Sequence, residues 1–284
     1  AKPCAPCYRS PMRVIYIAGT SHSGSTLLDL MLNAHPAIFS AGEVLKLNRQ
    51  LGINHPRKQN SAPCSCGAPS LWQCPVWSRV DARTRETVGK SLTDLDMLDY
   101  GETDAGKAPN ALVFKAIADV TGKNFVVDSS KLPKRLAYLM QLEELDVYPV
   151  HIVRDPKGQI NSVTRKHGGF LKHIFRYELI HEQIRRALKS VPHSVVHYED
   201  LVRDPAGTLA SILQPLGLSF DPRQLAWAEA EKHEVAGNHV RFDAKSELVL
   251  DEGWRESLSP LRQRAIDIGT LMSRQTLPKT GAVR

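Results

Sequence analysis

The feature of this sequence that most constrains its fold is a short apolar run that leads through a glycine-containing loop into an amphipathic helix. Residues 13–18 (RVIYIA) are typical of a buried parallel strand. After the loop GTSHSGS, the segment STLLDLMLNA places apolar residues on successive helical turns and stops at His35 and Pro36, because proline disfavours helix in the residue before it. The loop amides and the positive end of the helix would converge on one point. The segment therefore predicts an anion-binding site.

The loop fulfils most of the nucleotide-binding pattern G-x-x-x-x-G-K-S/T. Gly19, Gly24 and Thr26 have the required spacing. Ser25 stands where the pattern has the lysine that reaches the β- and γ-phosphates. Asp128 ends an apolar run, as a magnesium-binding carboxylate would, but the Ser-Ser-Lys that follows it favours anion binding. The loop therefore suits a phosphosulfate, whose terminal sulfuryl group carries one negative charge fewer than a phosphoryl group.

Strands and helices are expected to alternate through most of the chain. Apolar runs predict strands at 125–128, 147–153 and 194–198, and helices are expected at 45–51, 82–90, 110–120, 133–144, 157–165, within 171–189 and at 205–216. This alternation predicts an α/β fold with a parallel sheet covered by helices on both faces. We expect a single domain over 1–284. In it, residues 51–106 form a cysteine-containing, irregular insertion or lid, and residues 220–284 form a helical C-terminal segment.

Ligands of parallel sheets bind at the carboxyl ends of the strands. The candidate site segments are therefore those that follow the predicted strands, namely 19–26, 128–131, 154–156 and 198–200. A net charge of +7 favours an anionic partner, and the scattered cations without a nucleic-acid-binding motif favour a phosphorylated small molecule over a polynucleotide. No apolar run approaches the ~20 residues of a membrane-spanning helix.

The five cysteines fall into two clusters. Cys4 and Cys7 form a C-x-x-C pair, and Cys64, Cys66 and Cys74 lie in CSCGAPSLWQC. Cys4, Cys7, Cys64 and Cys66 could together supply four zinc thiolates, but C-x-C is tighter than the usual ligand spacing. Buried thiols or one local disulfide are the alternatives, so the sequence assigns no metal site.

Two separate motifs resemble those of the sulfotransferases that use 3′-phosphoadenosine 5′-phosphosulfate (PAPS). IAGTSHSGSTLLDLMLNAHP followed by SAGE resembles their 5′-phosphosulfate loop, helix, His-Pro turn and glutamate. VYPVHIVRDPKGQINS resembles their 3′-phosphate element, an arginine at a strand end with a serine eight residues later, here Arg154 and Ser162. VVDSSKLPKRL and VVHYEDLVRDP also resemble family segments, so the likeness covers roughly 13–217 apart from the insertion. The motifs of this chain are most similar to those of bacterial, tyrosylprotein and carbohydrate sulfotransferases.

The resemblance implies a PAPS-dependent enzyme with 3′-phosphoadenosine 5′-phosphate (PAP) as its product and no metal requirement. It would move the sulfuryl group in line onto a hydroxyl, phenol or amine. Tyr198 would stack on adenine or simply pack, and HEVAGNHVRF resembles a G-N-x-x-R cofactor loop of related bacterial enzymes. The cofactor-binding residues that it implies are Ser21, His22, Ser23, Gly24, Ser25, Thr26, Arg154, Ser162, Tyr198, Gly237, Asn238 and Arg241.

The resemblance also implies the catalytic residues. Glu43 matches the glutamate taken as general base, and it would serve best as a base if burial raises its pKa, although an acid at this position could also serve the first turn of the helix at 45–51. His22 replaces the usual lysine or arginine before Ser-Gly and would donate to the leaving phosphate. Lys131 is the alternative source of that positive charge, and its competing interpretation is a solvated surface lysine.

Two other functions remain open from the sequence. One is a P-loop small-molecule kinase whose displaced lysine is Lys131 or Lys134. The other is a non-catalytic module that binds acidic glycans or nucleic acid through a basic face. The expected acceptor is a small molecule or a glycan, with no nucleic acid partner and no membrane span. Four tryptophans could form an apolar acceptor wall: Trp72, Trp77, Trp227 and Trp254. The family resemblance implies a cytoplasmic location if the protein is bacterial, or the Golgi lumen if it belongs to a membrane-anchored eukaryotic enzyme.

Overall fold

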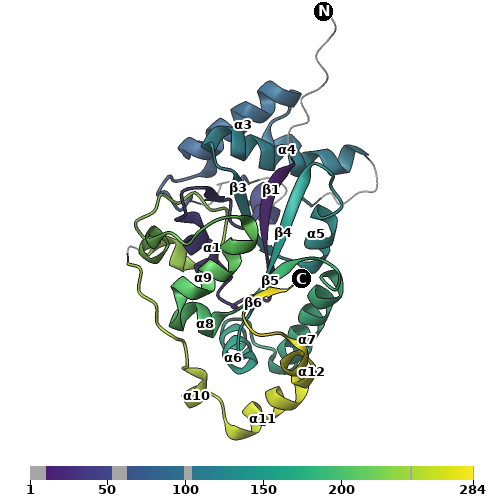
Figure 1. The fold of residues 1–284 in the computed structure, drawn as a ribbon, viewed down its shortest axis with the longest axis vertical. Coiled ribbons are helices and arrows are strands. Elements are labelled where there is room, and N and C mark those ends of the chain that lie inside the picture. The colour runs from purple at the N-terminus through teal and green to yellow at the C-terminus, as the bar shows by residue number, and fades with distance from the viewer. Residues whose placement is uncertain (1–10, 53–62, 99–103, 244, 284) are drawn as a thin grey trace, which may run out of the picture.

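The computed structural model describes residues 11–52, 63–98, 104–243 and 245–283. Within these residues the strands form a six-stranded sheet in the order β2-β3-β1-β4-β5-β6 (Figure 1). The strands are β1 Met12–Gly19, β2 Ile38–Ser40, β3 Phe125–Lys131, β4 Leu145–Val153, β5 His193–His197 and β6 Gly281–Val283. The first five pair in parallel and β6 pairs antiparallel with β5. The predicted α/β fold is therefore confirmed, with one antiparallel strand added at the edge of the sheet.

Helices cover both faces of this sheet. The α-helices are α1 Ser25–Asn33, α2 Leu47–Gln50, α3 Pro75–Val88, α4 Asp104–Thr121, α5 Pro133–Leu139, α6 Pro156–His167, α7 Phe170–Ala187, α8 Tyr198–Arg203, α9 Pro205–Leu213, α10 Trp254–Ser257, α11 Pro260–Gly269 and α12 Leu271–Thr276. Short 3-10 helices are η1 Val44–Lys46, η2 Leu71–Gln73, η3 Leu92–Asp94, η4 Gln214–Leu216, η5 Pro222–Ala226 and η6 His239–Phe242. One face carries α1, α8 and α9, and the other carries α4, α5 and α7.

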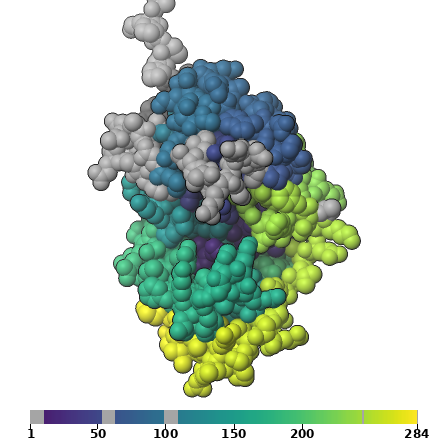
Figure 2. Space-filling view, turned by 180° about the vertical axis from the view of Figure 1, so that it is seen from behind, coloured from purple at the N-terminus to yellow at the C-terminus, as the bar shows by residue number. Residues whose placement is uncertain are grey.

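The insertion and the C-terminal helices lie at opposite ends of the molecule. α3 lies at one end of the view in Figure 1, and α10 and α11 lie at the other. The same separation of blue and yellow surfaces is visible from behind (Figure 2). Residues 63–98 contain α3 and short 3-10 turns but no strand. In the described part of the chain, no helix combines the length and the apolar character needed to cross a membrane.

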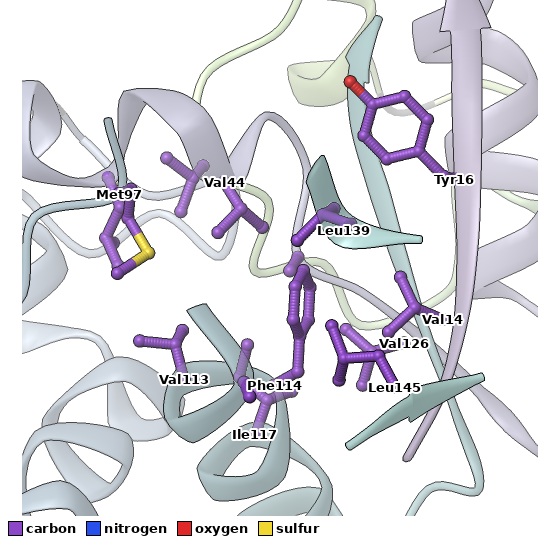
Figure 3. Close-up of a cluster of buried hydrophobic side chains, with 14 of the residues drawn as sticks. Val14, Tyr16, Val44, Met97, Val113, Phe114, Ile117, Val126, Leu139 and Leu145 are labelled. Atoms are coloured by element: carbon purple, nitrogen blue, oxygen red, sulfur yellow. The ribbon is translucent and has the colours of Figure 1, made fainter. Parts of the chain in front are cut away.

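Alternate residues of β1 point into two separate apolar cores. Val14 and Tyr16 belong to the core that also contains Phe114 of α4 (Figure 3). Ile15 and Ile17 belong to the opposite core, under α1 and α9. Because β1 is buried on both faces, its sequence is a continuous apolar run instead of an alternating one. This placement fixes β1 at the centre of the sheet, and the loop that follows it lies at the middle of the carboxyl edge.

Several boundaries differ from those that the sequence predicts. The sequence patterns do not predict β2, β6 or α8, since the two strands have three residues each and α8 has only six. α5 ends at Leu139 and not at 144, because the chain must turn before β4 begins at Leu145. α4 begins at Asp104, before the predicted start at 110, and carries Pro109 inside it.

Candidate active site

A cavity of about 490 Å³ lies at the carboxyl ends of β1, β3 and β4. In the view from behind, purple residues from near the N-terminus lie in a hollow between teal and yellow-green surfaces (Figure 2). The predicted site residues that line the cavity are Ser21, His22, Gly24, Ser25, Thr26, Glu43, Lys131, Arg154, Ser162, Tyr198, Gly237 and Asn238. Only Ser23 and Arg241, among the predicted cofactor and catalytic residues, are absent from its lining.

The loop after β1 is shaped by two residues in the left-handed backbone region. His22 has φ 64° and Gly24 has φ 89°. A Cβ atom at Gly24 would lie 2.5 Å from the ring of Tyr198, so a side chain fits there neither by conformation nor by space. Ser23 is fully buried beneath the loop, and no described residue hydrogen-bonds its hydroxyl. Tyr198 is therefore packed against the glycine of this loop, and the anion cradle of backbone amides stays a prediction.

Arg154 connects the loop after β1 to the element after β4. The residue is only 6% exposed, and its Nη1 donates to the carbonyl oxygen of His22 at 3.0 Å. Its guanidinium lies 4.6 Å from the ring centre of Tyr198, and Nη2 donates to the carboxylate of Asp251 at 2.7 Å. Tyr198 thus supports Arg154 by a cation–π contact. Asp251 has no counterpart in the sequence motifs, because it lies 97 residues away in an irregular segment.

His22 also contacts the second predicted cofactor residue on α6. Its Nδ1 lies 2.9 Å from the hydroxyl oxygen of Ser162. Burial, together with the charges of Lys166 and His167, lowers the pKa of His22 below its ordinary value. The imidazole is therefore mostly neutral at pH 7, and in that form one ring nitrogen donates while the other accepts. The two predicted cofactor elements consequently meet at His22.

Glu43 is a buried carboxylate held between two lysines. Lys131 Nζ donates to its Oε1 at 2.7 Å, and Lys46 pairs with its Oε2. Burial alone would raise the pKa of Glu43, but the charges of Lys131 and Lys46 outweigh burial and hold the pKa below its usual range. Burial therefore acts in the direction considered from the sequence, but the two lysines reverse the net shift. The sequence motifs do not identify Lys46 as a site residue. Its position three residues after Glu43, where a helical turn brings the two side chains together, could have indicated the pair.

Lys131 is not the solvated surface lysine that was its competing interpretation. Its side chain is 13% exposed and also donates to the carbonyl oxygen of Ser129 at 3.0 Å. Its backbone has φ 70°, which is uncommon for a residue with a side chain. Glu43 precedes η1 but makes no side-chain cap there, so its carboxylate serves the lysine pair instead of the helix.

Asp128, the candidate magnesium-binding carboxylate, serves the fold. It is fully buried, and Arg135 Nε donates to its Oδ2 at 2.8 Å. The backbone N–H of Ser130 donates to the other carboxylate oxygen at 2.9 Å. Asp128 is not among the residues that line the cavity, and neither is Lys134, which is exposed on α5. This arrangement disfavours the kinase interpretation.

The loop with Gly237 and Asn238 lies beside the helix end, but Arg241 faces inward. The backbone N–H of Asn238 donates to the hydroxyl of Thr26 at 3.3 Å. Arg241 is 7% exposed, and its guanidinium donates to the carbonyl oxygens of Glu234 and Ala236. The Arg241 guanidinium thus holds its own loop, and its role in binding the cofactor stays a prediction.

The four tryptophans do not form one apolar wall. Trp227 lines the cavity and belongs to the core under α1, whereas Trp77 is buried in the core under α4. Trp254 packs on the small core of α6 and α11, with Lys157 Nζ 5.4 Å from its ring centre. Trp72 is 37% exposed on the insertion. The expectation of a shared acceptor wall is therefore wrong, and only Trp227 remains a candidate for it.

Comparisons with known proteins agree on one family. The sequence profile described as the sulfotransferase family matches residues 14–222. The sulfotransferase domain of the Synechococcus PCC 7002 olefin synthase is 22% identical, with 96% of this chain and 98% of that chain covered and a TM-score of 0.54. The sulfotransferase domain of the curacin biosynthetic pathway is 16% identical, with 93% and 98% covered and a TM-score of 0.56. Sulfotransferase STF9 from Mycobacterium avium is 13% identical, with 97% and 79% covered and a TM-score of 0.53. No curated protein matches the chain.

Proposed function

The chain belongs to the sulfotransferase family, and from this premise we propose that it transfers the sulfuryl group of PAPS to a hydroxyl, phenol or amine. One observation supports this function above the others. The loop after β1, the Arg154 and Ser162 element and Glu43 line the same cavity, and the first two are in direct contact through His22. A nucleotide with phosphates at two positions requires two anion sites within one molecule's reach.

The donor sets of the two sites fit the two ends of the nucleotide. The amides of residues 22–26 and the N-terminus of α1 would hold the 5′-phosphosulfate. The guanidinium fork of Arg154 and the hydroxyl of Ser162 would hold the 3′-phosphate. Asp251 would give up Arg154 to that phosphate, because its carboxylate is 56% exposed and can be solvated instead.

Glu43 would accept the proton of the acceptor group, and Lys131 would stabilise the negative charge on the leaving phosphate. When bound, PAPS supplies an activated sulfuryl group, whose S–O bond to the 5′-phosphate breaks as the acceptor oxygen or nitrogen attacks sulfur. Lys131 would then turn from Glu43 toward the phosphate, where negative charge develops. Loss of that cation raises the pKa of Glu43 toward its normal range, so its carboxylate becomes a stronger base for the acceptor proton. His22 would donate a hydrogen bond to the same phosphate.

Calorimetry tests this proposal against the two alternatives. PAP should bind without Mg²⁺, whereas ATP should bind more weakly with or without Mg²⁺. A heparin fragment at physiological salt should not displace PAP. Tight, Mg²⁺-dependent ATP binding would instead support a kinase. Heparin binding that falls steeply with salt, together with no PAP binding, would support a basic binding module.

The variant His22→Lys should change how kcat/KM depends on pH. In the wild type, kcat/KM should fall as pH rises through the lowered pKa of His22, which lies below the ordinary histidine value of about 6.5, because the imidazolium is populated only below that pKa. Lysine stays charged over this range, so the variant should lose this alkaline fall. The profile of kcat/KM is the appropriate measurement because it reports groups of the free enzyme. An identical alkaline limb in both proteins would remove His22 from the charge-stabilising role.

A further inference from the structure

A second cluster of reactive side chains lies outside the cavity, where the insertion meets the segment before Gly237. It consists of Cys64, Cys66, Cys74 and His233, and one ligand atom from each of the four lies within 4.8 Å of the others. Cys64, Cys74 and His233 are buried, and Cys66 is exposed. We propose that these four residues bind one Zn²⁺ ion in a structural Cys₃His site.

The distances between the ligand atoms fit a four-coordinate zinc site. Zinc binds thiolates at about 2.3 Å and imidazole nitrogen at about 2.0–2.1 Å, so neighbouring ligand atoms lie about 3.5–3.8 Å apart. Here Cys74 Sγ and His233 Nδ1 are 3.1 Å apart, and no pair of the ligand atoms exceeds 4.8 Å.

The backbone presents the three cysteines from two ordered segments. The N–H of Cys64 donates to the carbonyl oxygen of Ala68 at 2.9 Å, and the N–H of Gly67 donates to that of Cys64 at 3.0 Å. Gly67 has φ 88°, which allows this tight turn. Cys74 is the N-cap residue of α3, where the positive helix end favours a thiolate. Two thiols thus come from one turn, and the third comes from a helix start.

His233 is oriented as metal-binding histidines usually are. Its Nδ1 faces Cys74, while its Nε2 lies 2.8 Å from the carboxylate of Glu231. A carboxylate on the far nitrogen fixes the tautomer and directs the near nitrogen to the metal. Trp77 also donates from its indole nitrogen to the carbonyl oxygen of His233 at 2.7 Å. The second shell of a zinc ligand is therefore already present.

A metal explains this cluster better than a disulfide does. A bond between Cys64 and Cys74 would leave Cys66 unpaired, and the oriented imidazole at the same point would have no purpose. Soft thiolates with one imidazole in a tetrahedral arrangement favour zinc. The ligand set differs from the four cysteines considered from sequence, since Cys4 and Cys7 lie outside the described residues and His233 lies 159 residues from Cys74.

The site would fasten the insertion to the loop that borders the active site. Next to His233, the N–H of Glu234 donates to the hydroxyl of Ser65 at 2.8 Å. The N–H of Glu43 donates to the carbonyl oxygen of Val235 at 2.7 Å. Zinc bound to His233 would therefore stabilise the hydrogen bond between Val235 and Glu43. Loss of the metal should increase the mobility of both the insertion and Glu43.

Metal content of the full chain tests the proposal directly. Protein prepared without chelators should contain about one zinc per chain by mass spectrometry, and its Co²⁺ form should show the visible absorption of tetrahedral thiolate coordination. Cys66→Ser alters an exposed side chain and should remove both signals without unfolding the chain. The double variant Cys4→Ser, Cys7→Ser is the control and should keep them.

Two further measurements separate a structural site from weak surface binding. Glu231→Gln should weaken zinc affinity by about 10–100-fold through the lost second-shell carboxylate, whereas Glu229→Gln should not change it. Chelation should lower the unfolding temperature of the wild type but not that of Cys66→Ser. The proposal is overturned by zinc-free protein that takes up no zinc, by a Cys64–Cys74 disulfide in the native protein, or by zinc that the Cys4, Cys7 double variant removes.

Discussion

Replacing Glu43 with glutamine should reduce kcat for sulfuryl transfer by about 10²–10⁴-fold, the usual contribution of a positioned general base. The amide keeps the size of the side chain and can still contact Lys131 and Lys46, but it cannot take a proton. PAP should bind at least as tightly as in the wild type, because the two lysines no longer share their charge with a carboxylate. Steady-state kinetics and calorimetry with PAP measure the two quantities separately.

The control for this variant is Glu143→Gln, which removes a carboxylate from an exposed position far from the cavity lining. It should leave both kcat and PAP affinity unchanged. Parallel loss of turnover and PAP binding in Glu43→Gln would assign Glu43 to structure and not to proton transfer. Full activity would exclude it as the base.

Replacing Arg135 with leucine should lower the free energy of unfolding by about 3–5 kcal/mol, because it leaves the carboxylate of Asp128 buried without its partner. Both side chains are 0% exposed, and their N–O distance is 2.8 Å. Arg135 also donates to the side chain of Asn110 and to the carbonyl oxygen of Met97. Urea unfolding at neutral pH measures the loss.

The double variant Arg135→Leu, Asp128→Leu is the informative control. It removes the stranded charge together with its partner, so it should be more stable than Arg135→Leu alone. Arg83→Leu breaks an exposed pair with Asp119 and should cost far less stability than Arg135→Leu. If Arg135→Leu loses as little unfolding free energy as Arg83→Leu, the account of a fully buried ion pair between Arg135 and Asp128 is contradicted.

The central strands could be predicted because their signal is local. β1, β3, β4 and β5 are buried runs of apolar residues, and each is bounded by polar or glycine positions. β2 and β6 are only three residues long, and they become strands because β3 and β5 offer them free edges. Such elements are created by tertiary pairing, which a sequence window does not contain.

The positions of the site residues followed from topology, but their electrostatics did not. Parallel strands end at one edge, so Gly24, Lys131 and Arg154 were expected to meet there. For Glu43, the sequence suggested only the effect of burial, whereas the two lysines beside it lower its pKa. The pairing of Arg154 with Asp251 depends on an irregular segment with no periodic pattern. Charge pairing between distant segments is therefore the part that the sequence does not reveal.

A crystal structure of the protein with PAP tests the central claim most directly. We expect the 5′-phosphate on the amides of residues 22–26 and the 3′-phosphate on Arg154 and Ser162, with Arg154 released from Asp251. Lys131 should turn from Glu43 toward the 5′-phosphate. PAP bound outside this cavity, or with its 3′-phosphate away from Arg154, would contradict the account.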